Sequence, residues 1–510
     1  MSNARSRFIA SVAIAALIIV VSLSQRASAS PLQDFIGDTG SSAAMQARTV
    51  PGGSAAAYFN PALLSDAPAG VTVGLVILNE GYGIELDGRP GTEFAIPEGI
   101  ETFGHADTKR FDNYPIPTNL LQNGRKMDAR RAEFDPRPRQ GAGSGHGTRS
   151  YETVGLVVKL FHDRATIGFH GLIPNGEFTK MRAFFNDERE QYFSNSLHPE
   201  LYSDRMLALS MALGLGIKLS DRLSIGAGAT FALKAAVIAG AYVADTGNLG
   251  AIQLDMDASV NIGISPHFGV SYKATDRLRL TATAHTPQRV ELGTSFKFLL
   301  ANGIEQSSGL TFVLDYTPWQ IGLGASYDIL QEKEQTLTVA ATALYADWSS
   351  YIDRHGEKPS PAFAWANTLS PTVGLRYRLG DVSTSLDLAY TPTPVPLQRG
   401  RTNYVDNDRA SGGLGAKYDF QLFGSAMSVG AQLQVSRLVP RHQAKLATPT
   451  RADGAVLAPD HVKDELPDDA QKSGDPVAGA EGLQTNNPGW PGFASGGWIL
   501  AAALYLSLAF

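Results

Sequence analysis

The sequence of 510 residues contains no cysteine, which excludes disulfide bonds, thiolate metal sites and cysteine nucleophiles. Beyond its N-terminal residues it has no apolar run of the length that a membrane-spanning helix needs. The formal net charge of −6 provides no basic surface of the kind that binds nucleic acid. These absences argue against a helical membrane protein and against a nucleic-acid-binding protein.

Catalytic and metal-binding motifs are also missing. The sequence has no G-x-S-x-G or H-E-x-x-H motif, and Gly143-Ser-Gly-His146 has the wrong spacing for a nucleophile elbow. Asp255 and Asp257 lack the glycine and the spacing of a calcium loop. We therefore predict no enzyme activity, no catalytic residue, no metal site and no cofactor.

The C-terminal residues alternate strictly between two faces. Trp498, Leu500 and every second residue to Phe510 form a bulky apolar face, whereas the residues between them are mostly smaller. A strand with this pattern fits a barrel wall between lipid and lumen, although the last strand of a soluble sandwich is the alternative. Ending such a strand on Phe510 is typical of an outer-membrane barrel that its assembly machinery recognises.

Residues 1–29 read as a secretory signal peptide. Arg5 and Arg7 form a basic start, residues 8–23 are almost entirely apolar, and Ala27-Ser-Ala29 is an A-x-A cleavage site. A single membrane anchor is the alternative, but the apolar stretch is short for a span. The pattern predicts export across the inner membrane.

About fourteen segments have strand character, the even number that single-chain bacterial barrels have. They are 70–79, 151–160, 164–173, 205–219, 222–243, 259–273, 277–298, 309–330, 336–348, 369–379, 382–392, 410–420, 424–438 and 495–510. Short joints such as Ser220-Asp-Arg222 and Thr275-Asp-Arg277 alternate with long connections, among them 80–150, 174–204 and 439–494. We predict an all-β transmembrane antiparallel barrel over residues 70–510, with its short turns on the periplasmic side.

Residues 30–69 interrupt this pattern before the first strand. Small residues dominate, as in Gly52-Gly-Ser-Ala-Ala-Ala-Tyr-Phe-Asn60-Pro61-Ala62, and strand alternation is absent. Such a segment can fold compactly in a confined space such as a barrel lumen.

The run from Ser54 to Ala62 resembles the hatch of the outer-membrane long-chain fatty acid transporter family. Three further blocks are similar to that family and occur in the expected order: residues 318–349, 371–396 and 406–418. The chain departs from the family at Val405, where proline is more usual, and in the length of connections 80–150 and 439–494.

The resemblance implies a fourteen-stranded barrel whose lumen is plugged by an N-terminal hatch, residues 30–69, with Asn60, Pro61 and Ala62 at the hatch centre. A hydrophobic ligand would land on the outer loops, enter a pocket above the hatch, and leave sideways into the bilayer beside a kink in the third strand. Gly168 and Gly171 in the predicted third strand are candidates for that kink, with ordinary barrel glycines as the alternative.

The implied function is passive transport of hydrophobic compounds, foremost long-chain fatty acids, across the bacterial outer membrane. Small aromatic hydrocarbons are an alternative substrate class, and a structural or adhesive barrel is an alternative role. The implied partners are the hydrophobic ligand and the outer-membrane lipids. A carboxylate ligand would need a basic partner in the lumen, for which Arg279, His285, Lys297 and Lys234 are candidates.

Overall fold

The computed structural model describes residues 32–87, 121–122, 125–126, 145–176, 197–199, 201–202, 206, 209–243, 252–300, 305–353, 356, 358–359, 361, 364–400, 403–445, 447–448, 462–463 and 492–510. The predicted signal peptide, residues 1–29, and most of the connections predicted at 80–150, 174–204 and 439–494 lie outside the described residues.

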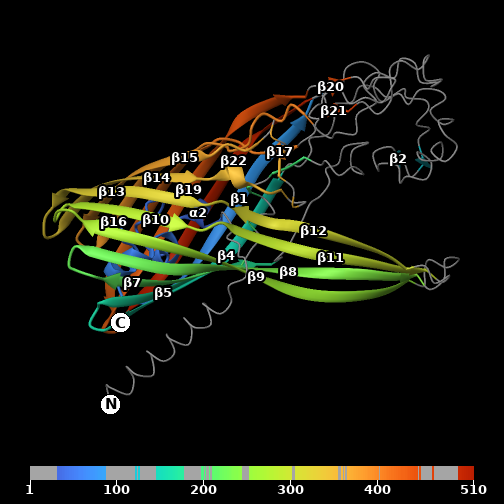
Figure 1. Cartoon of the computed structure of the whole chain (residues 1–510). Helices are drawn as coiled ribbons and strands as arrows, with labels where there is room; N and C mark the ends of the chain where they lie inside the picture. Colours follow the sequence, from blue (N-terminus) through green and yellow to red (C-terminus); the bar gives the residue numbers. More distant parts are fainter. Residues whose placement is uncertain are drawn as a thin grey trace.

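Within the described residues, one sheet of 16 strands dominates the fold, and fourteen of these strands close into a ring (Figure 1). In order around the ring they are β8 (Leu223–Val243), β7 (Leu209–Lys218), β5 (Ala165–Asn175), β4 (Gly145–Leu160), β1 (Gly70–Leu86), β22 (Gly492–Ala509), β19 (Ser425–Ala444), β18 (Arg409–Leu422), β16 (Val382–Thr391), β15 (Thr368–Leu379), β14 (Gln335–Ala346), β13 (Gln320–Gln331), β10 (Leu278–His285) and β9 (Ile252–Lys273). Antiparallel pairing of β8 with β9 closes the ring. The predicted antiparallel barrel of about 14 strands is confirmed.

The other two strands of the sheet, β11 (Gln288–Leu300) and β12 (Glu305–Thr317), form a hairpin beyond the barrel (Figure 1). Each of the predicted segments 277–298 and 309–330 is therefore two strands, separated at Pro287 and Pro318. Proline cannot donate a hydrogen bond to a ladder, so a strand ends at it readily. At its far end, β11 pairs in parallel with the end of β8.

The short turns gather at one end of the barrel, which we call the short-turn end; the opposite end is the long-loop end. The Ser220 and Thr275 hydroxyls each accept hydrogen bonds from the backbone two and three residues ahead, which fixes the two similar turns. The chain also ends here, where the Phe510 nitrogen donates to the Ala69 oxygen at 3.4 Å.

The outer face of the barrel is apolar. On β22, Trp498, Leu504, Leu506 and Leu508 are exposed, whereas the residues between them point to the lumen, as the alternation predicts. Trp498 and Leu508 lie ten residues apart, which at about 3.3 Å per residue and a tilt of about 40° gives an apolar band of about 25 Å. This height matches the hydrocarbon-facing band of a transmembrane barrel.

The remaining described elements are short. They are the helices α2 (Leu32–Ile36), α3 (Ala56–Phe59), η1 (Pro61–Asp66) and η7 (Trp348–Ser350), and the strands β2 (Leu121–Gln122), β3 (Arg125–Lys126), β6 (His198–Pro199), β17 (Tyr404–Val405), β20 (Ala447–Thr448) and β21 (Val462–Lys463).

Candidate functional site: the hatch and the lumen wall

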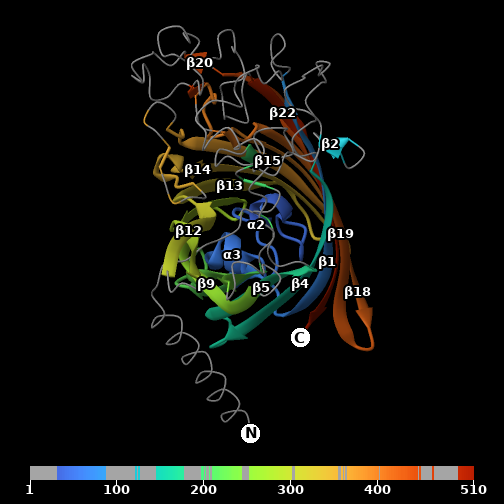
Figure 2. The ribbon, with the colours of Figure 1, turned by 90° about the vertical axis from the view of Figure 1, so that its right-hand side faces the viewer.

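Residues 32–69, which we call the hatch, lie inside the ring of strands, where Figure 2 shows α2 and α3 surrounded by the barrel wall. Most of their side chains are buried. The hatch has little secondary structure because its many alanines, serines and glycines leave it few bulky side chains to pack against one another. Its stability in this position therefore depends on contacts with the wall.

Asn60 and Pro61 start the last helix of the hatch. The Asn60 side chain caps η1 by accepting a hydrogen bond from the Ala62 nitrogen at 3.2 Å, and its amide donates to the Arg48 carbonyl at 3.0 Å. Pro61 occupies the first helical position, where a missing N–H costs nothing. All three residues are buried. The sequence-predicted centre of the hatch is thus a buried cap and not a surface turn.

Glycines in the wall leave room for this turn. A methyl group on Gly226 of β8 would overlap the backbone of Pro61 and Ala62, and one on Gly269 of β9 would overlap the Asn60 side chain. The hatch backbone therefore approaches the wall more closely than any residue with a Cβ atom permits.

Gly168 of β5 has the same role. A methyl group at this position would overlap Leu64 of η1. β5 pairs with β4 from Ala165 to Asn175 and with β7 from Ala165 to Leu172, without a register shift in either ladder. Both ladders run through Gly168 and Gly171, and the lateral opening beside these glycines stays a prediction.

A buried ion pair fixes the first half of the hatch. Arg376 of β15 binds Asp387 of β16 through two hydrogen bonds of 2.7 and 2.9 Å. The same guanidinium donates to the Ala43 carbonyl, and the Asp387 carboxylate accepts from the Met45 nitrogen at 3.1 Å. Two adjacent wall residues thus hold one turn of the hatch backbone from both sides.

A second set of contacts joins the middle of the hatch to β10 and β13. Arg48 lies 3.0 Å from the His285 ring nitrogen and donates to Gln320 at 3.2 Å, and it also pairs with Asp34 of the hatch at 2.8 Å. The His285 ring stacks on His267, which also lies 2.6 Å from the Ala57 carbonyl oxygen of the hatch. The His285 side chain therefore contacts the hatch, through Arg48, in this structure.

Two of the candidate basic partners of a ligand contact the hatch in this structure. Arg279 binds Asp66 at the end of the hatch at 2.7 Å, and His285 binds Arg48. The Lys234 and Lys297 side chains lie outside the described part of the chain.

One sector of the inner wall is apolar. Val76 and Leu78 of β1, with Ile499 of β22, are buried against Leu32 and Phe35 of the hatch helix α2. Tyr151, Leu172, Tyr202 and Met206 belong to the same cluster. The opposite sector is polar, as Ser383, Ser385 and Asp387 of β16 show. Buried apolar side chains of β22, β1, β4 and β5 therefore line part of the lumen next to the hatch, alongside polar residues such as Glu80 and Thr153.

No protein-family model matches this sequence, and no curated protein matches it. A FadL homologue of Pseudomonas aeruginosa has a similar solved structure, with a TM-score of 0.51 and 15% identity over 95% of this chain and 99% of that chain. In fold, this chain is a FadL-type barrel. The toluene transporters TodX of Pseudomonas putida and TbuX of Ralstonia pickettii match with TM-scores of 0.46 and 0.45, each at 12% identity, over 95% of this chain and 99% and 100% of theirs.

The FadL-type barrel has the architecture of bacterial outer-membrane proteins: a closed antiparallel sheet, an even number of strands and an apolar outer band. It is therefore a bacterial outer-membrane barrel. Among the described residues, no helix is both long enough and apolar enough to cross a membrane.

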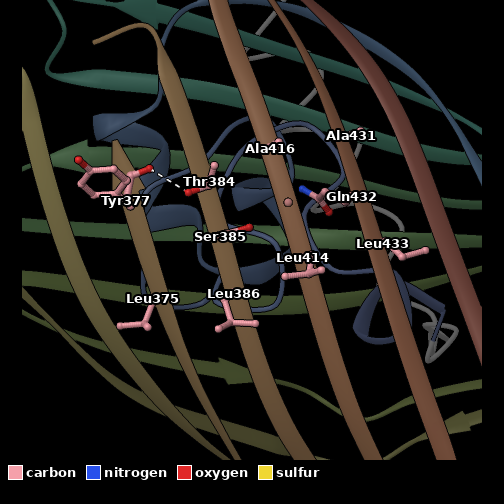
Figure 3. Close-up of a pocket in the computed structure, with 11 residues that line it drawn as sticks. Leu375, Tyr377, Thr384, Ser385, Leu386, Leu414, Ala416, Ala431, Gln432 and Leu433 are labelled. Carbon is pink, nitrogen blue, oxygen red and sulfur yellow. Dashed lines mark hydrogen bonds between the residues drawn. The ribbon is translucent and has the colours of Figure 1, made fainter. Parts of the chain in front are cut away.

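A hollow of about 490 Å³ lies on the outer wall of the FadL-type barrel, across β15, β16, β18 and β19. Figure 3 shows Leu375, Leu386, Leu414 and Leu433 in a row along it, with the smaller Ala416 and Ala431 on one side of that row. The leucines belong to the exposed apolar band. This hollow faces the lipid and does not belong to the lumen.

Sequence reasoning missed the residues that hold the hatch. Asp387 was recognisable as a charge on the lumen face of its strand, but its partner Arg376 lies on the neighbouring strand, 11 positions away in the sequence. The available signal was that both residues lie at lumen-facing positions of their alternating strands. It gave no indication that the pair would bind the backbone at Ala43 and Met45.

Proposed function

We propose that this chain is a member of the FadL-type family and carries hydrophobic compounds, foremost long-chain fatty acids, passively across the outer membrane. The observation that supports the proposal most is the plugged lumen with an apolar sector beside the plug. An open general porin would need a continuous aqueous channel, whereas a sector lined by residues such as Val76 and Leu78 suits a hydrocarbon chain.

The physical task is to shield a hydrocarbon chain past the polar outer surface of the membrane. A ligand enters at the long-loop end and moves along the apolar sector, where α2 now covers the wall. The hatch must shift for the ligand to pass. Dilution of the ligand into the bilayer drives the flux, so no energy source is needed.

Lateral exit is part of this proposal, and the seam between β5 and β7 is the candidate place. Its ladder ends at Leu172 and Ser210, above which no described residue of β5 pairs with β7. Lateral exit along this seam requires the backbone hydrogen bonds between β5 and β7 to break.

Uptake of labelled oleate tests the proposal in cells that lack their own fatty acid transporter and express this chain. A variant with Asn60→Ala and Pro61→Ala loses the cap of η1, so we expect saturable oleate uptake in the wild type and weaker uptake in the variant. Unlabelled toluene serves as competitor, and competition would widen the substrate class to aromatic hydrocarbons. A correctly folded, heat-modifiable barrel with no uptake above the empty vector would contradict transport and favour an adhesive role.

A further inference from the structure

A polar cavity of about 220 Å³ lies at the short-turn end of the barrel, where the hatch ends. Its lining comes from the last residue of η1, from β7, β8, β9 and β10, and from the turn before β8. The lining residues are Asp66, Lys218, Asp221, Arg222, Ser224, Ser271, Lys273 and Arg279. None of the groups identified above as holding the middle of the hatch belongs to it.

Cations outnumber anions around this cavity. Four side chains, Lys218, Arg222, Lys273 and Arg279, are basic, whereas Asp66 and Asp221 are acidic. Asp276, just outside the lining, lies 3.6 Å from Arg222, and both of these side chains are largely exposed. The local potential therefore favours an anion, in a chain whose overall net charge is −6.

Asp66 already shows how a carboxylate is held there. One of its oxygens lies 2.7 Å from Arg279, and the other lies 3.3 Å from Lys273 and 4.0 Å from Lys218. Arg279 is itself oriented by a hydrogen bond of 2.9 Å to Ser271. Three cations from three strands thus converge on a single carboxylate.

The Asp66 carboxylate lies at the junction between the hatch and the barrel. Asp66 is the last residue of η1 and directly precedes the segment that enters β1. A shift at the end of the hatch would remove Asp66 and leave the cations without their carboxylate. A ligand carboxylate in the same place would restore the charge balance.

We propose that this cavity binds the carboxylate of an anionic amphiphile, which replaces Asp66 at Arg279 and Lys273 and so releases the end of the hatch. This inference rests on the proposed transport function and narrows its substrate class to fatty acids over neutral aromatic hydrocarbons. Lys218 of β7 lines this cavity, and the ladder between β5 and β7 begins beside it, at Ala165 and Ile217.

Binding to the purified full-length barrel in a neutral detergent tests the site directly. Isothermal titration compares octanoate with octanol, which has the same chain length and no charge, and with inorganic phosphate. The variant carries Arg279→Gln and Lys273→Gln, and the control carries Lys417→Gln, which removes an ion pair of 2.8 Å with Asp419.

We expect octanoate to bind the wild type and the control more tightly than octanol, with an affinity at least tenfold lower in the double variant. Octanol binding is expected to be equal in all three proteins. Equal binding of octanoate and octanol to the wild type, or unchanged octanoate binding in the double variant, would overturn the inference. Phosphate that displaces octanoate at equal concentration would also overturn it, because the site would then be one for small inorganic anions.

Uptake in cells separates this inference from the proposed function. The double variant is expected to lose oleate uptake and to keep any toluene uptake that the wild type shows. Normal oleate uptake by a correctly folded double variant would refute the carboxylate site and leave transport standing. No uptake of either compound by the wild type would refute transport, whatever the titration shows.

Discussion

At the scale of single residues, the Arg376–Asp387 pair links the wall to the hatch through two buried charges. Both side chains are buried, and both also bind hatch backbone. Removing one partner of a buried pair costs about 3–5 kcal/mol because the other charge loses its compensation. An exposed pair such as Lys417–Asp419 is worth about 0–1 kcal/mol.

Asp387→Asn is therefore expected to loosen the hatch around Ala43 and Met45. The measurement is single-channel conductance in planar bilayers, where a loosened plug admits ions more often than the wild type does. Lys417→Gln is the matched control and should conduct like the wild type. An equally closed Asp387→Asn channel would show that this pair does not hold the hatch.

The Asp66 contact predicts a pH dependence. Burial raises the pKa of Asp66, but the charges and hydrogen bonds of Arg279 and Lys273 outweigh this effect and hold that pKa below its usual value of 3.8. A carboxyl whose pKa is lowered on folding contributes stability above its unfolded pKa and loses it as the pH falls through the folded value.

We therefore expect the end of the hatch to loosen below about pH 3.8, the unfolded value. Hydrogen exchange of residues 61–66, followed by mass spectrometry between pH 6 and pH 3, measures the effect after correction for the intrinsic rate. Asp66→Asn should exchange faster at pH 6 and change less with pH. A wild type and a variant that change in parallel would show that another group is responsible.

At the scale of elements, β5 and β7 form the seam at which lateral exit is proposed. Phe169 and Leu213 are direct partners in this ladder. Directly opposed residues of an antiparallel pair have Cα atoms about 4.5–5.5 Å apart, within the range that a disulfide spans.

The absence of cysteine makes a cross-link at this seam unambiguous. Phe169→Cys with Leu213→Cys should block oleate uptake when oxidised and restore it on reduction, because the strands can no longer part. Val373→Cys with Leu388→Cys, a partner pair in the β15–β16 ladder, is the control and should leave uptake unchanged. Full uptake through the oxidised β5–β7 seam would place the exit elsewhere.

The elements also show what sequence could predict. Alternation indicates which side of a strand faces lipid, and Trp498, Leu504 and Leu506 are exposed as their spacing predicts. The departure of β11 and β12 from the barrel was not predicted, because an alternating pattern continues on both sides of Pro287 and Pro318. The alternating pattern in a sequence indicates that a strand is present. Which strand it pairs with depends on residues far away in the sequence.

At the scale of the whole molecule, the barrel and the hatch depend on each other. Small residues in the hatch predicted a compact segment inside the lumen, and the wall glycines at positions 168, 226 and 269 supply the space for it. The glycines themselves are apparent in the sequence. Their role is not, because it depends on how closely the hatch and the wall approach one another in the fold. The kink at Gly168 and Gly171 stays a prediction: both ladders of β5 keep their register through these glycines in this structure, and Gly168 faces Leu64.

The central claim is that the hatch must move for a ligand to pass. The Ser65 hydroxyl of η1 donates to the Ser224 hydroxyl of β8 at 2.9 Å, so cysteines at these two positions would tether the hatch to the wall. The decisive measurement is oleate uptake by the Ser65→Cys, Ser224→Cys variant, with the cross-link confirmed by mass spectrometry. We predict that uptake stops in the oxidised protein and returns on reduction. Uptake that continues at the wild-type rate through a fully cross-linked hatch would contradict the account.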